Sequence, residues 1–321
     1  MVFALFLRHF PANQKIYPNL SSNKIMRLKD KLKEIIPKEK WKYLPSSFEI
    51  IGSREKAIAI VEIDENLNEF EKEIGKAIAE LHKNVNVVLR KLSERIGEER
   101  IRKFKRIYGN ENTEVIHKEN GYLIKVDPTK VYFSAKEGEE RKRIALKVKE
   151  NENVLVMFSG VAPFAIAIAK FQPKVNKIYC IELNKIANEY NKIYCIELNK
   201  IANEYAKENV KINKVSEKVV LIEGKVEDVW KKIEKKFDRI IMPLPLKALE
   251  YLEIAIKLLK KDGIIHLYGI SKEENLFKDI EERIEKIAKN LNVKFEIVER
   301  RKISLYAPRK WKVRIDIKVR K

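Results

Sequence analysis

Cysteine is almost absent from this sequence. Among its 321 residues only Cys180 and Cys195 are cysteines, and both are copies of one position in an internal repeat. They form neither a disulfide framework nor the closely spaced pairs of a zinc site. We therefore expect a reducing compartment, the cytoplasm, and no bound metal.

Signals for export and membrane insertion are missing as well. The chain begins with an apolar run that Arg8 and His9 end, without the basic segment and small-residue cleavage site of a signal peptide. No uninterrupted apolar run reaches the roughly 20 residues of a membrane-spanning helix. We therefore expect no membrane partner.

Nucleotide-binding motifs that need several glycines are also absent. No Gly-Lys-Ser or Gly-Lys-Thr follows Gly160, which excludes a Walker loop there. The second and third glycines of the dinucleotide fingerprint are missing too, so a dinucleotide cofactor is disfavoured.

Positive charge, in contrast, is in clear excess. The sequence has 68 Lys and Arg against 47 Asp and Glu, a net charge of +21. A basic surface gains affinity for nucleic acid by releasing counterions from phosphates. High charge of both signs is also typical of thermophilic proteins, so composition alone leaves both interpretations open.

The N-terminal third predicts an arm and a small α/β domain. Residues 1–27 carry Pro11 and Pro18 and indicate a loosely ordered arm, and residues 28–95 predict the small domain. Its expected elements are a helix, two strands, an amphipathic helix and a strand, at Asp30–Ile36, Phe48–Ile51, Ala57–Ile63, Asn66–His82 and Asn86–Leu89.

Residues 96–150 predict a connecting region. Ile96–Asn112 is strongly basic and is interpreted as a linker, although such a charge run is more often a solvated helix face than a binding site. Glu114–Val126 predicts a β-hairpin with Glu119-Asn120-Gly121 as its turn. Tyr132–Lys147 predicts a loop that becomes a helix.

Residues 151–321 alternate between strand and helix patterns, which is typical of a doubly wound parallel sheet. The expected strands are Asn153–Phe158, Lys177–Ile181, Val219–Ile222, Arg239–Met242 and Gly263–Tyr268. The tail predicts an antiparallel pair that completes the sheet, at Lys294–Val298 and Trp311–Val319.

An exact repeat interrupts this domain. The segment Asn176–Tyr190 recurs without change as Asn191–Tyr205. If the first copy formed the strand, the next helix would lengthen by the whole repeat, about 22 Å. We therefore favour the second copy as the strand. The acid at its end, Glu197 rather than Glu182, would then accept the hydroxyls of a ribose.

Two further loops follow predicted strands at the edge where such folds bind ligands. Gly160 allows a tight turn and a close approach of a ligand to the backbone. Pro243 and Pro245 stop the strand at Met242 and form a rigid lip suited to a flat base. Each signal alone is weak.

Taken in order, several motifs become specific. They are His117-Lys-Glu-Asn-Gly-Tyr122, Val131-Tyr-Phe-Ser134, Glu139-Glu-Arg141, Phe158-Ser-Gly-Val161, Met242-Pro-Leu-Pro245 and Tyr306-Ala-Pro308. From about Leu28 to the C-terminus the chain resembles the archaeal and eukaryotic tRNA guanine-37 N1-methyltransferases, whose relatives build wyosine bases. The resemblance implies a Rossmann-like class I fold, S-adenosylmethionine as cofactor, and a monomer that binds the anticodon stem-loop of tRNA.

The resemblance also implies roles for individual residues. Glu140 matches the general base and Arg100 its partner arginine. The cofactor contacts implied by the resemblance and by the loops above are Arg141, Phe158, Gly160, Glu182, Glu197, Lys225, Val226 and Pro243. The expected contacts to the target base and to the tRNA are Tyr132, Pro245, Arg102, Lys118 and Arg309, with Lys310 and Lys312 as further phosphate contacts.

Some positions depart from the family pattern. Lys225 stands where an acid is expected, which leaves adenine recognition to the backbone or to Glu227. Pro243 stands where relatives often have asparagine. The resulting Met-Pro-Leu-Pro motif resembles that of an archaeal branch with members that also methylate 4-demethylwyosine. The alternatives are aminocarboxypropyl transfer from the same cofactor, or a noncatalytic tRNA-binding protein.

Overall fold

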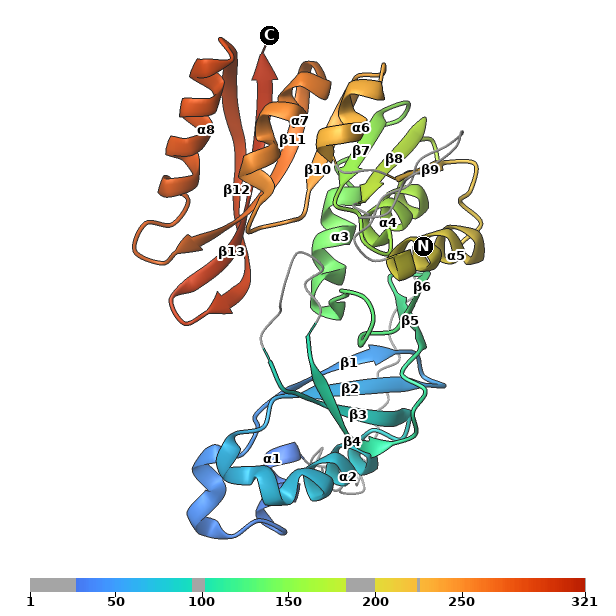
Figure 1. Ribbon diagram of the computed structural model, residues 1–321, viewed down its shortest axis with the longest axis vertical. Coiled ribbons are helices and arrows are strands. Elements are labelled where there is room, and N and C mark those ends of the chain that lie inside the picture. Colours follow the sequence, from blue (N-terminus) through green and yellow to red (C-terminus); the bar gives the residue numbers. More distant parts are fainter. Residues whose placement is uncertain (1–26, 94–101, 183–199, 224–225, 321) are drawn as a thin grey trace, which may run out of the picture.

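A computed structural model describes residues 27–93, 102–182, 200–223 and 226–320. A small sheet with two helices and a larger sheet with helices on both faces are joined by a β-hairpin and a helix (Figure 1). Across the described ranges, every helix is too short or too polar to traverse a lipid bilayer.

The small domain is a four-stranded sheet in the order β1-β2-β3-β4. Its strands are β1 (Phe48–Gly52), β2 (Ala57–Val61), β3 (Val85–Lys91) and β4 (Phe104–Gly109). Its helices are α1 (Leu28–Lys33), α2 (Glu71–Leu81) and two short 3-10 helices, Lys38–Tyr43 and Glu65–Phe70. In β2, Ala57 and Ala59 pack toward α1 and α2, whereas Ile58 and Ile60 pack toward the hairpin. Both faces of this sheet are therefore covered.

Strand β4 differs from the sequence prediction. Residues 96–112 were expected to be a linker and the small domain to end near Arg95, but 104–109 pair antiparallel with β3. Only Ile107 of this strand is buried, so its sequence lacks the alternation that predicts a strand. These residues form a strand because they pair with the open edge of β3, not because of their own sequence pattern.

The hairpin consists of β5 (Val115–Glu119) and β6 (Tyr122–Val126), as predicted. Asn120 and Gly121 both have positive φ, 45° and 84°, as the tight turn requires. The 3-10 helix Ala135–Glu137 and α3 (Gly138–Ala145) follow. The Gly52 N–H donates to Nδ1 of His117 at 3.1 Å, so the hairpin is bonded to the small domain.

The large sheet has seven strands in the order β12-β13-β11-β10-β7-β8-β9. The five strands from β11 to the edge strand β9 are parallel, and β13 pairs antiparallel with both β11 and β12. The strands are β7 (Asn153–Met157), β8 (Lys177–Glu182), β9 (Val219–Glu223), β10 (Phe237–Met242), β11 (Leu259–Lys272), β12 (Lys294–Ala307) and β13 (Lys310–Arg320). This confirms the predicted Rossmann-like sheet and its antiparallel tail.

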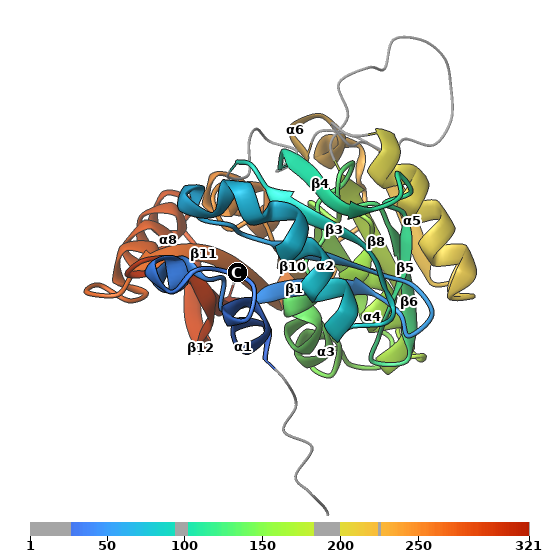
Figure 2. The same ribbon diagram turned by 90° about the horizontal axis from the view of Figure 1, so that it is seen from below.

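Helices cover both faces of this sheet. On one face α3, α4 (Pro163–Phe171) and α5 (Lys200–Ile212) share a core with the strands. On the other face lie α6 (Val226–Val229), α7 (Leu252–Leu258) and α8 (Lys278–Asn290), with 3-10 helices at Trp230–Lys232 and Ala248–Tyr251. Viewed from below, the small domain lies in front of the large one (Figure 2).

The repeat folds differently from the prediction. Strand β8 is formed by the first copy, and α5 begins at Lys200 in the second copy. The prediction that the second copy forms the strand is therefore wrong. It rested on the length that the added repeat would give the next helix, but the pairing of the first copy with β7 and β9 decides which copy is the strand. Residues 183–199 lie outside the described ranges.

Candidate functional site

Three strand ends meet at one edge of the large sheet. Met157 of β7 pairs with Ile181 of β8, and Val156 pairs with Ile241 of β10. Phe158 and Pro243, which follow β7 and β10, are therefore level with Glu182, the last residue of β8. The strand order reverses between β7 and β10, which is where open α/β sheets bind their ligands.

The loop after β7 has an unusual backbone. Phe158, Gly160 and Ala162 have φ values of 58°, 54° and 63°, in the left-handed region that L-residues rarely adopt. The Ser159 N–H donates to the Ile181 carbonyl at 3.1 Å, which ties the loop to β8. A Cβ on Gly160 would meet no atom within 4 Å, so the loop borders open space. This cradle fits an adenosine-type ligand lying against backbone.

An aromatic pair borders the same edge. The Phe158 ring packs edge-on against Tyr251, with 4.9 Å between the ring centroids. The Tyr251 hydroxyl donates to Glu227 at 2.9 Å, beside Val226 at the buried start of α6. Of the predicted cofactor contacts, Glu197 and Lys225 lie outside the described residues, and Glu182 is placed only by its backbone at the end of β8.

Glu140 lies in the first turn of α3 and is only 3% exposed. Its Oε1 accepts a hydrogen bond from the Tyr268 hydroxyl at 2.8 Å and another from Arg314. Its Oε2 accepts from Arg143. The family resemblance implies Arg100 as the partner arginine of this base, and that residue lies outside the described ranges.

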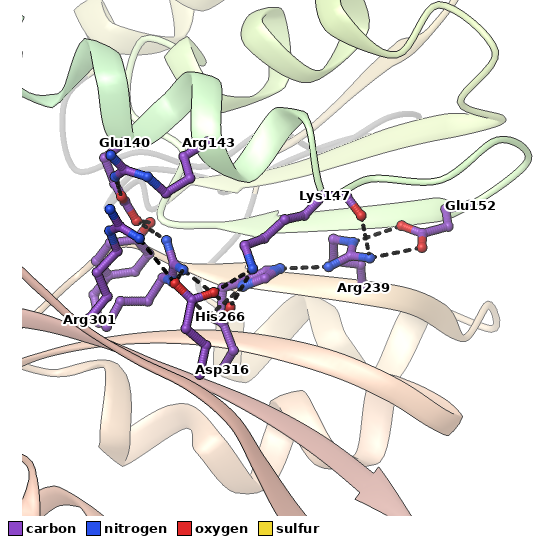
Figure 3. Close-up of polar contacts among 11 residues, drawn as sticks. Glu140, Arg143, Lys147, Glu152, Arg239, His266, Arg301 and Asp316 are labelled. Carbon is purple, nitrogen blue, oxygen red and sulfur yellow. Dashed lines mark hydrogen bonds and ion pairs between the residues drawn. The ribbon is translucent and has the colours of Figure 1, made fainter.

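A run of buried charged groups continues behind Glu140 (Figure 3). Arg314 donates to Asp316, which also bonds to His266, and His266 contacts Arg239. Burial alone would raise the pKa of Asp316, but the His266 hydrogen bond and nearby positive charges outweigh it and lower this pKa to about 2. Burial lowers the pKa of His266 and raises that of Tyr268.

Tyr132 is joined to this cluster through one carboxylate. Its hydroxyl donates to Glu137 at 3.1 Å, and the Lys312 ammonium donates to the same oxygen at 2.7 Å. Lys312 also lies 5.1 Å from the centroid of the Tyr268 ring. It is 5% exposed, so the expectation that it contacts phosphate is wrong: the pairing buries its charge inside the domain.

Arg141 is engaged by the hairpin. Its Nε donates to Glu119 at 2.7 Å, its Nη2 donates to Glu119 and to the Ser134 carbonyl, and its guanidinium lies over the Phe133 ring. At 2% exposed it fixes the hairpin to α3. Contact with a cofactor stays a prediction for this residue.

The expected substrate contacts are spread over the molecule. Arg102 and Tyr132 line one small pocket between the small domain and the connecting loop, together with Glu49 and Phe104. Pro245 is buried after β10, Lys118 is exposed on β5, and Arg309 is exposed in the turn between β12 and β13.

Several residues of the site escaped the sequence prediction. Tyr268 and Arg314 come from β11 and β13, and they bond to Glu140 across 128 and 174 positions of the chain. One signal was present: the tail alternates charged and apolar residues, as Lys312, Arg314 and Asp316. Because α3 and the 3-10 helix before it pack over this face of β13, its charged side chains are buried rather than solvated.

The fold and the site together define an α/β methyltransferase with a preceding small domain. Residues 115–192 and 185–298 match the TRM5/TYW2 methyltransferase domain, and residues 28–113 match the TYW2 N-terminal domain. The two methyltransferase matches overlap inside the repeat, so the family pattern needs only one copy of it. The chain belongs to the TRM5/TYW2 methyltransferase family.

Relatives of this chain are named for methyl transfer and for aminocarboxypropyl transfer. The chain is 38% identical over 319 residues to a tRNA (guanine(37)-N(1))-methyltransferase Trm5b of Pyrococcus abyssi, covering 99% of this chain and 88% of the relative. It is 31% identical over 305 residues to the tRNA (guanine(37)-N(1))/4-demethylwyosine(37)-methyltransferase Taw22 of Nanoarchaeum equitans, covering 84% and 99%. A tRNA(Phe) (4-demethylwyosine(37)-C(7)) aminocarboxypropyltransferase of Methanocaldococcus jannaschii is 35% identical over 223 residues, covering 69% and 81%.

Solved structures agree in fold. A crystal structure of Trm5b from Pyrococcus abyssi superposes with a TM-score of 0.75 at 41% identity, covering 89% of this chain and 78% of that one. A complex of aTrm5 with tRNALeu also gives 0.75, at 32% identity, covering 92% and 78%.

Proposed function

We propose that this protein transfers a methyl group from S-adenosylmethionine to N1 of guanosine 37 in tRNA. The observation that carries the proposal is the buried Glu140 carboxylate, held next to the edge where the strand order reverses. Met242 pairs with Leu267, so Pro243 stands level with Tyr268, whose hydroxyl bonds to Glu140. The expected base and the expected cofactor loop thus share one edge.

The chemistry needs a base at this place. Guanine N1 carries a proton and is a poor nucleophile until that proton is removed. Glu140 accepts the proton, and the electron pair of the N1–H bond forms the new N1–carbon bond. A bound S-adenosylmethionine supplies the methyl group from a sulfonium, and the electrons of the broken carbon–sulfur bond stay on sulfur. Negative charge that develops on O6 is stabilised by a guanidinium, the role expected of Arg100.

The residues of the carboxyl edge hold the cofactor. Gly160 has no side chain, so the cofactor can approach the backbone of this loop. Phe158 and Tyr251 form an apolar wall beside it. Glu182, at the end of β8, is the acid that accepts the ribose hydroxyls. The lip formed by Pro243 and Pro245 confines the base, because prolines cannot extend the strand.

The tRNA is held through its anticodon stem-loop. Arg102 and Tyr132, which line one small pocket beside the connecting loop, are the side chains that contact the target nucleotide. Lys118 and Arg309 are exposed and contact phosphates, so this part of the affinity falls with salt. One copy acts on one tRNA, which sedimentation of the mixed components would check.

The first test uses a methyl-labelled donor and two transcripts that differ only in G37 or A37. Label on the G37 transcript and none on the A37 transcript supports the assignment; equal label on both contradicts it. Glu140→Gln should lower the transfer rate by about 10²-fold to 10⁴-fold, the usual contribution of a general base. Its affinity for tRNA should stay close to that of the wild type, and an unimpaired variant would exclude Glu140 as the base.

Aminocarboxypropyl transfer is separated by where the label sits. A donor labelled in the methyl group marks the tRNA only if methyl is transferred. A donor labelled in the aminocarboxypropyl carbons marks it only in the other reaction. If neither donor marks the tRNA and calorimetry detects no donor binding, the protein is a noncatalytic tRNA-binding protein.

Methylation of 4-demethylwyosine is a second candidate activity, favoured by Pro243. Proline offers no side-chain hydrogen bond, so this part of the lip does not select for guanine over a tricyclic base. Mass spectrometry of nucleosides from tRNA carrying 4-demethylwyosine tests it: a gain of one methyl group supports the activity, and an unchanged mass removes it.

A further inference from the structure

The two oxygens of Glu140 have different surroundings. Oε1 receives hydrogen bonds from Tyr268 and from Arg314, which are both fully buried. Oε2 receives one from Arg143, whose side chain is 34% exposed. One oxygen is therefore held from inside the domain, and the other faces a side chain that solvent or substrate can reach.

The donors to Oε1 are themselves fixed by strand pairing. Tyr268 and Arg314 are register partners between β11 and β13, and His266 and Asp316 are the next pair on the same face. Arg314 Nε donates to Asp316 Oδ1 at 2.7 Å, and its Nη2 lies 3.0 Å from Glu299. With its guanidinium bonded on three sides, Arg314 has one available orientation toward Glu140.

The proton positions in this run follow from the donor types. Arg239 Nη1 lies 2.7 Å from Nε2 of His266, and arginine can only donate. Nε2 therefore accepts, so His266 is neutral and carries its proton on Nδ1. That proton is donated to Asp316 Oδ1 at 2.7 Å. Asp316 thus remains an anion that orients Arg314, and the lowered pKa of His266 agrees with this assignment.

We infer that Tyr268 and Arg314 are positioning residues that hold Oε1 of Glu140, so that Oε2 is the oxygen that accepts the proton from guanine N1. Asp316, held by neutral His266, orients Arg314 for this task. The inference rests on the proposed function, since it assumes that Glu140 is the base. The substrate displaces Arg143 from Oε2, and its partial exposure leaves it room to move.

Holding one oxygen matters because a carboxylate can rotate about its last bond. A base displaced by about 1 Å loses on the order of 10²-fold in rate. The two buried donors to Oε1 fix the rotation of the Glu140 carboxylate before the substrate binds. The base therefore does not have to be oriented during the reaction.

The test compares two tyrosine-to-phenylalanine variants. Tyr268→Phe removes the buried hydrogen bond to Glu140. Tyr205→Phe is the control: it removes a part-buried hydrogen bond of 2.7 Å from another buried tyrosine, Tyr205, to Glu114 on the far side of the hairpin. Single-turnover methyl transfer is measured at saturating tRNA and donor, with the two binding affinities and the unfolding midpoint measured separately. Tyr268→Phe should lose about 10-fold to 100-fold in rate with both affinities within about two-fold. Tyr205→Phe should keep the wild-type rate.

A double variant separates positioning from general structural damage. In a Glu140→Gln background, Tyr268→Phe should cause no further loss of rate, because the group it positions is gone. Asp316→Asn should behave in the same way with a smaller loss. A wild-type rate for Tyr268→Phe, or losses that multiply with that of Glu140→Gln, would overturn the inference. If the wild type itself fails to methylate the G37 transcript, the proposed function has failed instead.

Discussion

Glu119→Gln is expected to be among the most destabilising single changes of a charged residue in this protein. The Glu119 carboxylate ends β5 with its side chain 8% exposed, and it bonds to Arg141, to Tyr122 and to His117 at 3.3 Å. Burial would raise its pKa, but these partners lower it from the ordinary 4.5 to about 2. A shift of that size corresponds to about 3 kcal/mol of stability at neutral pH.

The sign follows from which state holds the proton more tightly. The unfolded chain binds this proton below about pH 4.5, whereas the folded chain resists binding it until about pH 2. The stabilisation is therefore complete above the unfolded pKa and is lost as the pH falls from about 4.5 to about 2. At pH 2 less than about 1 kcal/mol of it should remain.

Replacing Glu119 also leaves the Arg141 guanidinium buried without its carboxylate. Breaking a buried pair in this way costs about 3–5 kcal/mol, so Glu119→Gln should lower the free energy of unfolding in urea by that amount at pH 7. The matched control is Glu253→Gln. It removes an exposed pair, Glu253 to Lys257 at 2.6 Å, and should cost less than about 1 kcal/mol.

Two results would refute this reasoning. One is a Glu119→Gln variant within about 1 kcal/mol of the wild type at pH 7, like the exposed control. The other is a stability difference between variant and wild type that stays constant from pH 7 to pH 2, since the argument requires that difference to shrink in acid. Combining Glu119→Gln with Arg141→Met should restore part of the loss, because no buried charge then lacks a partner.

Three further predictions concern ligands. Gly160→Ala should cost about 1 kcal/mol in stability because its φ is 54°. In calorimetry it should weaken donor binding by more than this, because the added methyl points into open space at the cofactor edge. Unchanged affinity would place the cofactor elsewhere. Glu182→Ala should weaken donor binding more than Glu197→Ala, since the first copy of the repeat forms β8, and the reverse order would contradict that choice of copy. Arg309→Ala should reduce the slope of tRNA affinity against salt by about one phosphate contact, and an unchanged slope would remove Arg309 from the interface.

Local patterns predicted the elements whose signals are local. The turn at Asn120-Gly121, the strand–helix alternation after residue 151 and the proline stop after Met242 each depend on neighbouring residues. They led to the class of fold and to the edge that carries the site. Glu140 was found through the order of family motifs, and the structure adds that its carboxylate is buried.

The partners of Glu140 were beyond such reasoning. Tyr268 and Arg314 are far from it in the chain, and an alternating charged strand predicts a solvated face unless its position in the sheet is known. Lys312 was mistaken for a phosphate contact for the same reason, because Glu137 and α3 cover its face of β13.

The sequence by itself determined the Rossmann-like sheet, the hairpin and the small domain, because periodicity and turn residues act over a few positions. Tertiary structure alone decided three matters: that β4 joins the small sheet, that the first copy of the repeat forms β8, and that Tyr268 and Arg314 hold Glu140. The two copies of the repeat are identical, so no local pattern can tell which one forms the strand. An open strand edge pairs with residues distant in the chain, and a buried charge finds its partners there too. Those choices follow from pairing and packing in the folded molecule.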